Sequence, residues 1–297
     1  MVHYFSRRAY DAAQKTFTNN PASVTRYGRS QIVAGGGEQG NLTDQDTWLA
    51  EVSADAGAGD IVIYIHGYNT RRVDMFARHR TIERALANEG FACAVVSFDW
   101  PSNGNIVDYK SDRADAKTVA PFFVRDGVTL LRQIVPARRL HVIAHSMGAY
   151  LLLRALSEQG EDVQLGEVLF VAADVERRWM QDAAWGGLVM GHHCVRLSSY
   201  CNAHDEVLNL AEFPFLPGGE RAGRVGLPPN APPNHANISC TARYVKAVDD
   251  KTDFVSHRWY FDDARFWKDA ALTLAGTAAA ACPTRRAVAG GGQELVL

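Results

Sequence analysis

At residues 140–153 the chain reads LHVIAHSMGAYLLL. The first part has the apolar, β-branched composition of a buried strand, and the last part is apolar enough for a buried helix. Ser146 lies between them, with Ala144 two residues before it and Gly148 two residues after it. Small residues are needed at these two positions where a strand turns sharply into a helix around a strained serine. The stretch therefore predicts a nucleophile elbow, with Ala144 in place of the first glycine of the G-x-S-x-G pattern.

The sequence on both sides of this elbow alternates between short β-branched runs and helical patterns. That alternation is typical of an α/β protein, in which a mostly parallel central sheet is flanked by helices on both faces. The expected strands are residues 61–65, 92–98, 140–144, 168–172, 194–200 and 242–248, and the expected helices are residues 72–89, 113–134, 147–159 and 262–274. The loops that follow such strands are where these sheets bind ligands.

The chain has 297 residues, 47% of them hydrophobic, which is enough for one principal domain with a sizeable core. We expect residues 1–58 to be a lead-in segment that packs on the core, residues 59–281 to form the domain, and residues 282–297 to be a flexible tail. Within the domain, residues 176–193 are a candidate lid and residues 213–238, rich in Pro and Gly, an irregular loop.

Charge and cysteine content limit the partners that we expect. The 31 basic and 33 acidic residues leave a net charge of -2, so no global field attracts the protein to nucleic acid. The sequence has no long apolar run, so we expect no signal peptide and no membrane span. We therefore expect a cytoplasmic location. Five cysteines without paired spacing indicate reduced thiols, and no metal or cofactor is predicted. No pattern indicates an oligomeric state.

Ser146 would begin a helix, where free backbone N–H groups and the helix dipole favour negative charge on a tetrahedral intermediate. The Met147 N–H is therefore predicted as the first oxyanion donor. In the fold that carries such elbows, the second donor comes from a loop after an earlier strand, here HGYN at residues 66–69. We assign this donor to Tyr68, with Asn69 as an alternative donor or a brace, and expect the histidine of the loop to be structural.

A serine nucleophile needs a base, and in this fold the chain order is serine, acid, histidine. Asp205 follows the expected strand at residues 194–200 and is our first assignment for the acid, with Glu206 and Asp174 as alternatives. Two histidines, His235 and His257, lie downstream of Asp205. His257 directly precedes a helix-like segment, so we predict that it takes the proton of Ser146.

These motifs resemble an esterase-like branch of the α/β-hydrolases that is classified as a domain of unknown function. The resemblance runs from about residue 60 to residue 267 and rests on residues 65–70, 100–104, 144–148 and 199–200, with Tyr109, Asp112 and Asp205. Its most branch-specific part is Trp-Pro-Ser at residues 100–102. The resemblance implies the α/β-hydrolase fold, with Ser146 as nucleophile, Asp205 as acid, His257 as base and oxyanion donors near Tyr68 and Met147. It implies no substrate.

The predicted activity is that of a serine hydrolase, which cleaves a small-molecule carboxylic ester through an acyl-enzyme. Trp100, Asn69, Trp179 and Trp185 are the candidate substrate-binding residues. No strong cationic cluster follows the predicted nucleophile or base along the chain, which favours a neutral ester. The same groups would serve a thioesterase or an acyltransferase. The alternative from another class is a catalytically idle hydrolase fold that acts as a binding or scaffold protein.

Overall fold

The structure, a computed structural model, describes residues 1–33, 38–102, 109–158, 163–211, 219–249, 252–288 and 291–296. Its strands are β1 (Val2–Asp11), β2 (Thr16–Ile32), β3 (Glu38–Thr43), β4 (Asp60–Ile65), β5 (Cys93–Asp99), β6 (Leu140–His145), β7 (Leu165–Val171), β8 (Cys194–Cys201), β9 (His235–Ser239), β10 (Arg285–Ala287) and β11 (Gln293–Leu295). Its α-helices are α1 (Gln45–Ala56), α2 (Arg72–Asn88), α3 (Tyr109–Phe123), α4 (Thr129–Leu131), α5 (Met147–Ser157), α6 (Trp185–His193), α7 (Glu206–Ala211), α8 (Ala222–Val225), α9 (Thr241–Ala247), α10 (Asp253–Arg258) and α11 (Ala264–Leu274).

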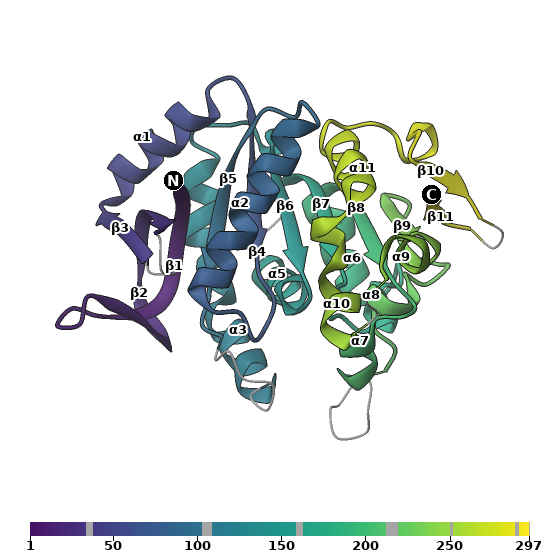
Figure 1. Ribbon diagram of the computed structural model, residues 1–297, viewed down its shortest axis with the longest axis horizontal. Coiled ribbons are helices and arrows are strands. Elements are labelled where there is room, and N and C mark those ends of the chain that lie inside the picture. The colour runs from purple at the N-terminus through teal and green to yellow at the C-terminus, as the bar shows by residue number, and fades with distance from the viewer. Residues whose placement is uncertain are drawn as a thin grey trace.

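All of these strands join one sheet, in the order β10-β11-β9-β8-β7-β6-β4-β5-β1-β2-β3 (Figure 1). The strands from β11 across to β1 are parallel to their neighbours. The pairs β1–β2, β2–β3 and β10–β11 are antiparallel and form the two edges. The mostly parallel sheet that the sequence predicts is therefore present, and the carboxyl ends of its central strands meet along one side.

The central strands are buried on both faces, which explains their nearly continuous apolar runs. In β4, Ile61, Ile63 and Ile65 belong to the core cluster that contains the buried side chains of α1, α3 and α5. Val62 and Tyr64 belong to the cluster formed with α2 and α11. Since successive side chains of a strand point to opposite faces, this one strand ties the two helical layers together.

The last strand differs from the prediction. Residues 242–248, expected as a strand, lie in and just after helix α9, and the strand at this place in the sheet is β9. The β9 segment is polar and only partly buried, and it follows Pro232 and Pro233, so it lacks the apolar run that marks the other strands. In α9 the buried Tyr244 packs on Trp259, with 5.6 Å between the ring centroids, so the apolar residues there serve one face of a helix.

Residues 176–193, predicted as a lid, instead connect the parallel strands β7 and β8. A 3-10 helix, η4 (Arg177–Met180), leads into α6, and α6 packs against α5. The rings of Trp179 and Trp185 lie 5.3 Å apart and pack against the core. Parallel strands need such a crossover helix. The aromatic residues that suggested a lid are the apolar face of this connection.

The C-terminal residues also differ from the prediction. A flexible tail was expected at residues 282–297, whereas β10 and β11 add to the sheet beside β9. Arg285 anchors this segment because its guanidinium pairs with the buried Asp269 at 2.7 Å. Tyr200 also donates to Asp269, at 2.8 Å. The prediction of a tail rested on the Gly-rich composition of residues 290–292, which gives no sign of this ion pair.

The segment predicted as an irregular loop, residues 213–238, is only partly described. Residues 219–238 contain helix α8 and most of β9, and residues 212–218 lie outside the described residues. Gly223 of α8 lies so close to the residues that follow β7 that a methyl carbon added to it would be 2.1 Å from the Ala173 nitrogen. No helix within the described ranges has both the length and the apolarity needed to cross a lipid bilayer.

Candidate active site

Ser146 lies at the turn between β6 and α5, as the sequence predicts. Its backbone has φ +54° and ψ -123°, a region that non-glycine residues avoid and that marks stored strain. A hydrogen bond of 3.0 Å from the Ser146 N–H to Val171 O holds the turn against the next strand. A methyl carbon added to Gly148 would lie 2.5 Å from Ile65 O, so a larger residue at this position would push α5 away from β4. The small residue after the serine is thus a steric requirement of this turn.

The loop that follows β4 lies against the elbow. A methyl carbon added to Gly67 would be 2.8 Å from the Ser146 Cβ, so glycine is what allows the loop to approach the serine. Asn69 has φ +54°, which asparagine tolerates better than most residues. The Asn69 N–H donates to Asp112 Oδ2 at 3.3 Å. The N–H of Asn69 is thus bound to Asp112, whereas that of Tyr68 is not. Tyr68 therefore stays our predicted oxyanion donor in this loop.

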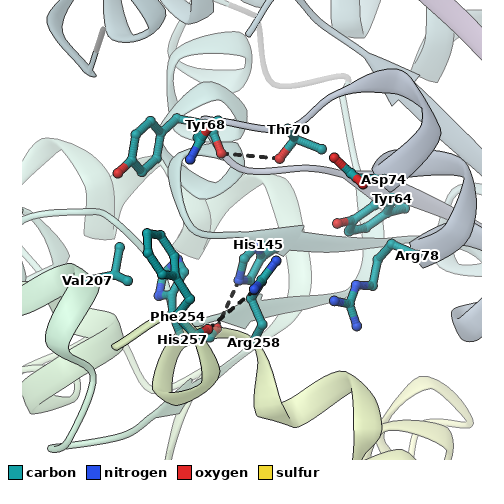
Figure 2. Close-up of a pocket in the computed structure, with 11 residues that line it drawn as sticks. Tyr64, Tyr68, Thr70, Asp74, Arg78, His145, Val207, Phe254, His257 and Arg258 are labelled. Carbon is teal, nitrogen blue, oxygen red and sulfur yellow. Dashed lines mark hydrogen bonds between the residues drawn. The ribbon is translucent and has the colours of Figure 1, made fainter. Parts of the chain in front are cut away.

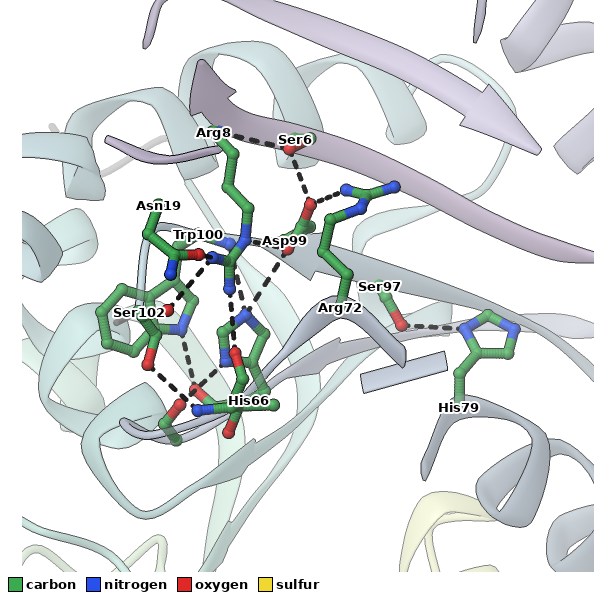
Figure 3. Close-up of polar contacts among 12 residues, drawn as sticks. Ser6, Arg8, Asn19, His66, Arg72, His79, Ser97, Asp99, Trp100 and Ser102 are labelled. Atoms are coloured by element: carbon green, nitrogen blue, oxygen red, sulfur yellow. Dashed lines mark hydrogen bonds and ion pairs between the residues drawn. The ribbon is translucent and has the colours of Figure 1, made fainter. Parts of the chain in front are cut away.

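A buried polar network braces this loop (Figure 3). Ser102 accepts from the Thr70 N–H at 3.1 Å and donates to Asp112 at 2.8 Å. Arg8, which is only 1% exposed, donates to the carbonyl oxygens of Ser102 at 3.1 Å and Thr70 at 3.0 Å. Its Nε also donates to the buried Asp99 at 2.7 Å. The Arg8 guanidinium thus joins strand β1 to the loop beside Ser146.

The Asp99 carboxylate stays charged although it is buried. Burial by itself opposes ionisation, but attraction to Arg72 and Arg8 outweighs it and lowers the pKa of Asp99 below its usual value. Ser6 also donates to this carboxylate, at 2.7 Å. Removal of one partner of a buried ion pair is costly because the other charge is left uncompensated. This network therefore fixes the geometry of the loop.

The predicted acid and base are hydrogen-bonded to each other. His257 Nδ1 lies 2.8 Å from Asp205 Oδ2. Asp205 is fully buried, and its other oxygen accepts from the Leu208 N–H at 3.0 Å. Because the side chain of Asp205 is held on both oxygens, it fixes the orientation of the His257 ring. The carboxylate also favours the tautomer with the proton on Nδ1, which leaves Nε2 as the basic nitrogen.

The alternative acids have other partners, and the alternative base lies in a strand of the sheet. Glu206 accepts from Asn209 at 2.9 Å. Asp174 pairs with Arg221 at 3.0 Å and accepts from the hydroxyl of Tyr109 at 2.7 Å. His235 lies in β9, paired in register with Leu197 of β8. Among the described residues, Asp205 is thus the carboxylate that holds His257.

Two residues that the sequence analysis left without a role connect the acid loop to the base helix. Asn202 donates to Ser256 O at 3.1 Å, and Ser256 Oγ accepts from the Glu206 N–H at 3.1 Å. Asn202 is fully buried. These bonds hold the loop of Asp205 against α10, which carries His257. No local pattern marks them, because each bond joins residues about 50 positions apart.

His145 is another residue whose role sequence reasoning missed, although it precedes the predicted nucleophile directly. Its Nε2 donates to His257 O at 3.2 Å, and the two ring centroids are 4.7 Å apart (Figure 2). Burial lowers the pKa of His145 well below its usual value, and the nearby His257 lowers it further. A neutral His145 thus supports the backbone of His257 without competing as an acid.

A cavity of about 100 Å³ opens beside these residues. Tyr68, Asn69, His145 and His257 contribute to its wall, and Figure 2 shows their neighbours. Drug-sized ligands occupy pockets of about 300–1,000 Å³. The cavity therefore has room for a small group.

Residues 42–258 match the family described as "Alpha/beta hydrolase of unknown function (DUF900)". The chain belongs to this family. Over 65 residues it is 42% identical to an uncharacterized protein of Nostoc sp. strain PCC 7120, a match that covers 22% of this chain and 17% of that protein. The chain thus spans well under two thirds of that relative. The solved ydeN gene product from B. subtilis is 15% identical and has a TM-score of 0.33, over 56% of this chain and 87% of that chain.

The family match over residues 42–258 confirms the α/β-hydrolase fold that the sequence predicts. In this DUF900 α/β-hydrolase, the branch-specific Trp-Pro-Ser segment supports the loop after β4. The Trp100 indole donates to His66 O at 2.8 Å, and the two rings are stacked with 5.1 Å between their centroids. Burial, with Arg8 nearby, lowers the pKa of His66 to about 4. His66 is thus a neutral, buried residue, as expected for a structural histidine. Asn103 and Gly104 of the same motif lie outside the described residues.

Three of the four predicted substrate-binding residues lie away from the cavity. Trp100 is fully buried under the loop. Trp179 and Trp185 pack beside α5, and neither is among the described residues that line the cavity. Asn69 does line it. Large aromatic side chains serve the core as readily as a pocket, so their presence near a motif could not separate the two roles.

Proposed function

We propose that the protein is a serine hydrolase that cleaves carboxylic esters through an acyl-enzyme. The observation that supports this most is the 2.8 Å hydrogen bond between Asp205 and His257. The strained backbone of Ser146 at a strand-to-helix turn supports it independently. A nucleophile, an oriented base and a buried acid are the three parts that acyl transfer by serine requires.

In the first half of the proposed reaction, Ser146 Oγ attacks the ester carbonyl carbon while His257 Nε2 takes the hydroxyl proton. Asp205 stabilises the imidazolium that forms. The negative oxygen of the tetrahedral intermediate accepts hydrogen bonds from the N–H groups of Tyr68 and Met147. The bond to the leaving oxygen then breaks, and His257 gives its proton to the alcohol.

The second half repeats the sequence with water. His257 removes a proton from water, and the hydroxide oxygen attacks the acyl carbon. When this intermediate collapses, the bond to Ser146 Oγ breaks, Ser146 regains a proton from His257, and the carboxylic acid leaves. The described lining of the cavity of about 100 Å³ includes His257 but not Ser146, which is 2% exposed. The small volume is our reason to propose a short acyl group instead of a fatty acyl chain.

The test is the pre-steady-state hydrolysis of 4-nitrophenyl acetate. We expect a burst of 4-nitrophenolate close to one equivalent per protein, because acylation of Ser146 precedes hydrolysis. Ser146→Ala should abolish the burst and the turnover. Ser157→Ala is the matched control, because Ser157 is exposed at the other end of α5 and is expected to keep both. Unchanged turnover in well-folded Ser146→Ala protein would exclude this function.

The cytoplasmic location also belongs to this proposal. All five cysteines are free thiols, and burial raises the pKa of Cys201 to about 12. Free, protonated thiols suit a reducing compartment. Fractionation of the source cells, with the protein followed by antibody, tests this location, and recovery outside the cytoplasm would contradict it.

A further inference from the structure

Two arginines from distant parts of the chain line the cavity beside His257 (Figure 2). Arg78 comes from α2, and its guanidinium lies 4.1 Å from the centre of the Phe261 ring. Arg258 follows His257 in α10, and its Nε donates to Phe254 O at 3.3 Å. Contacts with a ring and a carbonyl oxygen hold these side chains and leave their charges without a carboxylate.

Within the described part of the chain, neither arginine is in an ion pair. The cavity contains one aspartate, Asp74, and both of its oxygens accept from Arg71, at 2.7 and 3.0 Å. Tyr64, Asp262 and Asp74 also face Arg78, and their attraction favours its charged form without forming an ion pair. Burial lowers the pKa of Arg78 from its usual value, and repulsion from Arg258 contributes. The two guanidinium groups thus share a cavity whose one aspartate is hydrogen-bonded to Arg71.

We propose that Arg78 and Arg258 bind an anionic oxygen group of the substrate, a carboxylate or a phosphate, so that the preferred ester is anionic. This inference rests on the proposed serine hydrolase activity and names its substrate class. Arginine suits such groups because its fork of N–H donors matches their oxygen atoms. Since Arg258 is adjacent to the proposed base, the charged group would lie close to the ester that is cleaved.

The sequence alone favoured a neutral ester, for a reason that the structure makes clear. Arg258 is a single cation near the predicted base, and Arg78 belongs to a helix that begins before the elbow. Only the folded structure brings the second cation, from α2, to the same cavity as Arg258 of α10. Two other arginines of α2 pair with acids, Arg72 with Asp99 and Arg80 with Glu83.

The experiment compares three esters that share one acetyl group: 4-acetoxybenzoate, 4-acetoxyphenyl phosphate and the neutral methyl 4-acetoxybenzoate. The quantity measured is the ratio of kcat/KM for each anionic ester to kcat/KM for the neutral one. We expect this ratio to fall about tenfold in Arg258→Gln and in Arg78→Gln, because each variant loses a charged hydrogen-bond donor. The ratio should also fall when salt is raised, because salt screens exposed charges. Intrinsic differences between the esters cancel when a variant is compared with the wild type.

Arg84→Gln is the matched control, since it removes one positive charge from an exposed position of the same helix. Its ratio should equal that of the wild type. A fall for the benzoate alone would identify the bound group as a carboxylate, and a fall for the phosphate ester alone would identify a phosphate. Both results support the proposal. Equal ratios in the wild type, Arg78→Gln and Arg258→Gln would overturn it.

The two hypotheses fail in different ways. If Ser146→Ala abolishes hydrolysis of all three esters but the arginine variants leave the ratios unchanged, the anion site is wrong and the serine hydrolase stands. If Ser146→Ala hydrolyses the esters normally, the serine hydrolase itself is wrong. Arg258 is exposed, so Arg258→Gln decides the question even if the more buried Arg78→Gln does not fold.

Discussion

Replacement of Asp205 by asparagine removes the charge behind His257 while it keeps the size of the side chain. The Asp205 carboxylate is fully buried and 2.8 Å from the His257 ring nitrogen. Unit charges about 4 Å apart attract each other by about 4 kcal/mol at an effective dielectric constant of about 20. That attraction is present only when His257 is protonated, so its loss raises the barrier and slows the reaction about 10³-fold. An asparagine also favours the wrong tautomer of the imidazole, which adds to the loss.

The assay is kcat for 4-nitrophenyl acetate at neutral pH, with circular dichroism to show that each variant is folded. Glu206→Gln is the control because Glu206 is the next residue, and its carboxylate accepts from Asn209 instead of His257. We expect kcat of Glu206→Gln to stay close to that of the wild type. If Asp205→Asn keeps kcat within about tenfold of the wild type, or Glu206→Gln loses more, then Asp205 does not act as the acid.

Three further changes test other parts of the structure. Gly67→Ala places a methyl carbon 2.8 Å from the Ser146 Cβ, so we expect a lower acylation rate in stopped-flow measurements, and an unchanged rate would contradict the close approach. The pKa of His66 is about 4 in the folded protein and about 6.5 when unfolded, so below pH 6.5 the unfolded state binds the proton first. Stability to urea should then fall towards pH 4 by about 1.4 kcal/mol per pH unit from this group, a slope that His66→Gln should lose. Arg285→Met leaves Asp269 buried without its guanidinium and should lower the free energy of unfolding by about 3–5 kcal/mol, whereas a loss below about 1 kcal/mol would mean that the pair does not anchor β10.

Features that lie within a short stretch of sequence could be predicted. The turn at Ser146 needs a strand, a small residue on each side and a helix, and all of these occur within residues 140–153. The sheet could be predicted because its central strands are buried on both faces and consist almost entirely of apolar residues. Asp205 and His257 were assigned from their order along the chain after Ser146, although His257 lies in α10 and not directly after a strand.

Features that depend on long-range packing could not be predicted. The polar strand β9 has no pattern of its own and exists because β8 and β11 flank it. The C-terminal strands are held by Arg285 through an acid on α11, which composition cannot show. Trp179 and Trp185 could not be assigned from the sequence, because a tryptophan packs in a core as readily as it lines a pocket. Arg78 and Arg258 line one cavity only because distant segments of the chain fold together. Asn202 bonds to Ser256 only because its loop contacts α10.

The activation of Ser146 is tested most directly by labelling with a serine-directed fluorophosphonate, followed by intact mass and peptide mapping of the wild type, Ser146→Ala and His257→Ala. We expect one adduct in the wild type, located on Ser146, because Oγ displaces fluoride once His257 has taken its proton. We expect no adduct in Ser146→Ala and a strongly slowed reaction in His257→Ala. Labelling at another residue, or none in the well-folded wild type, would contradict the claim that Ser146 is an activated nucleophile.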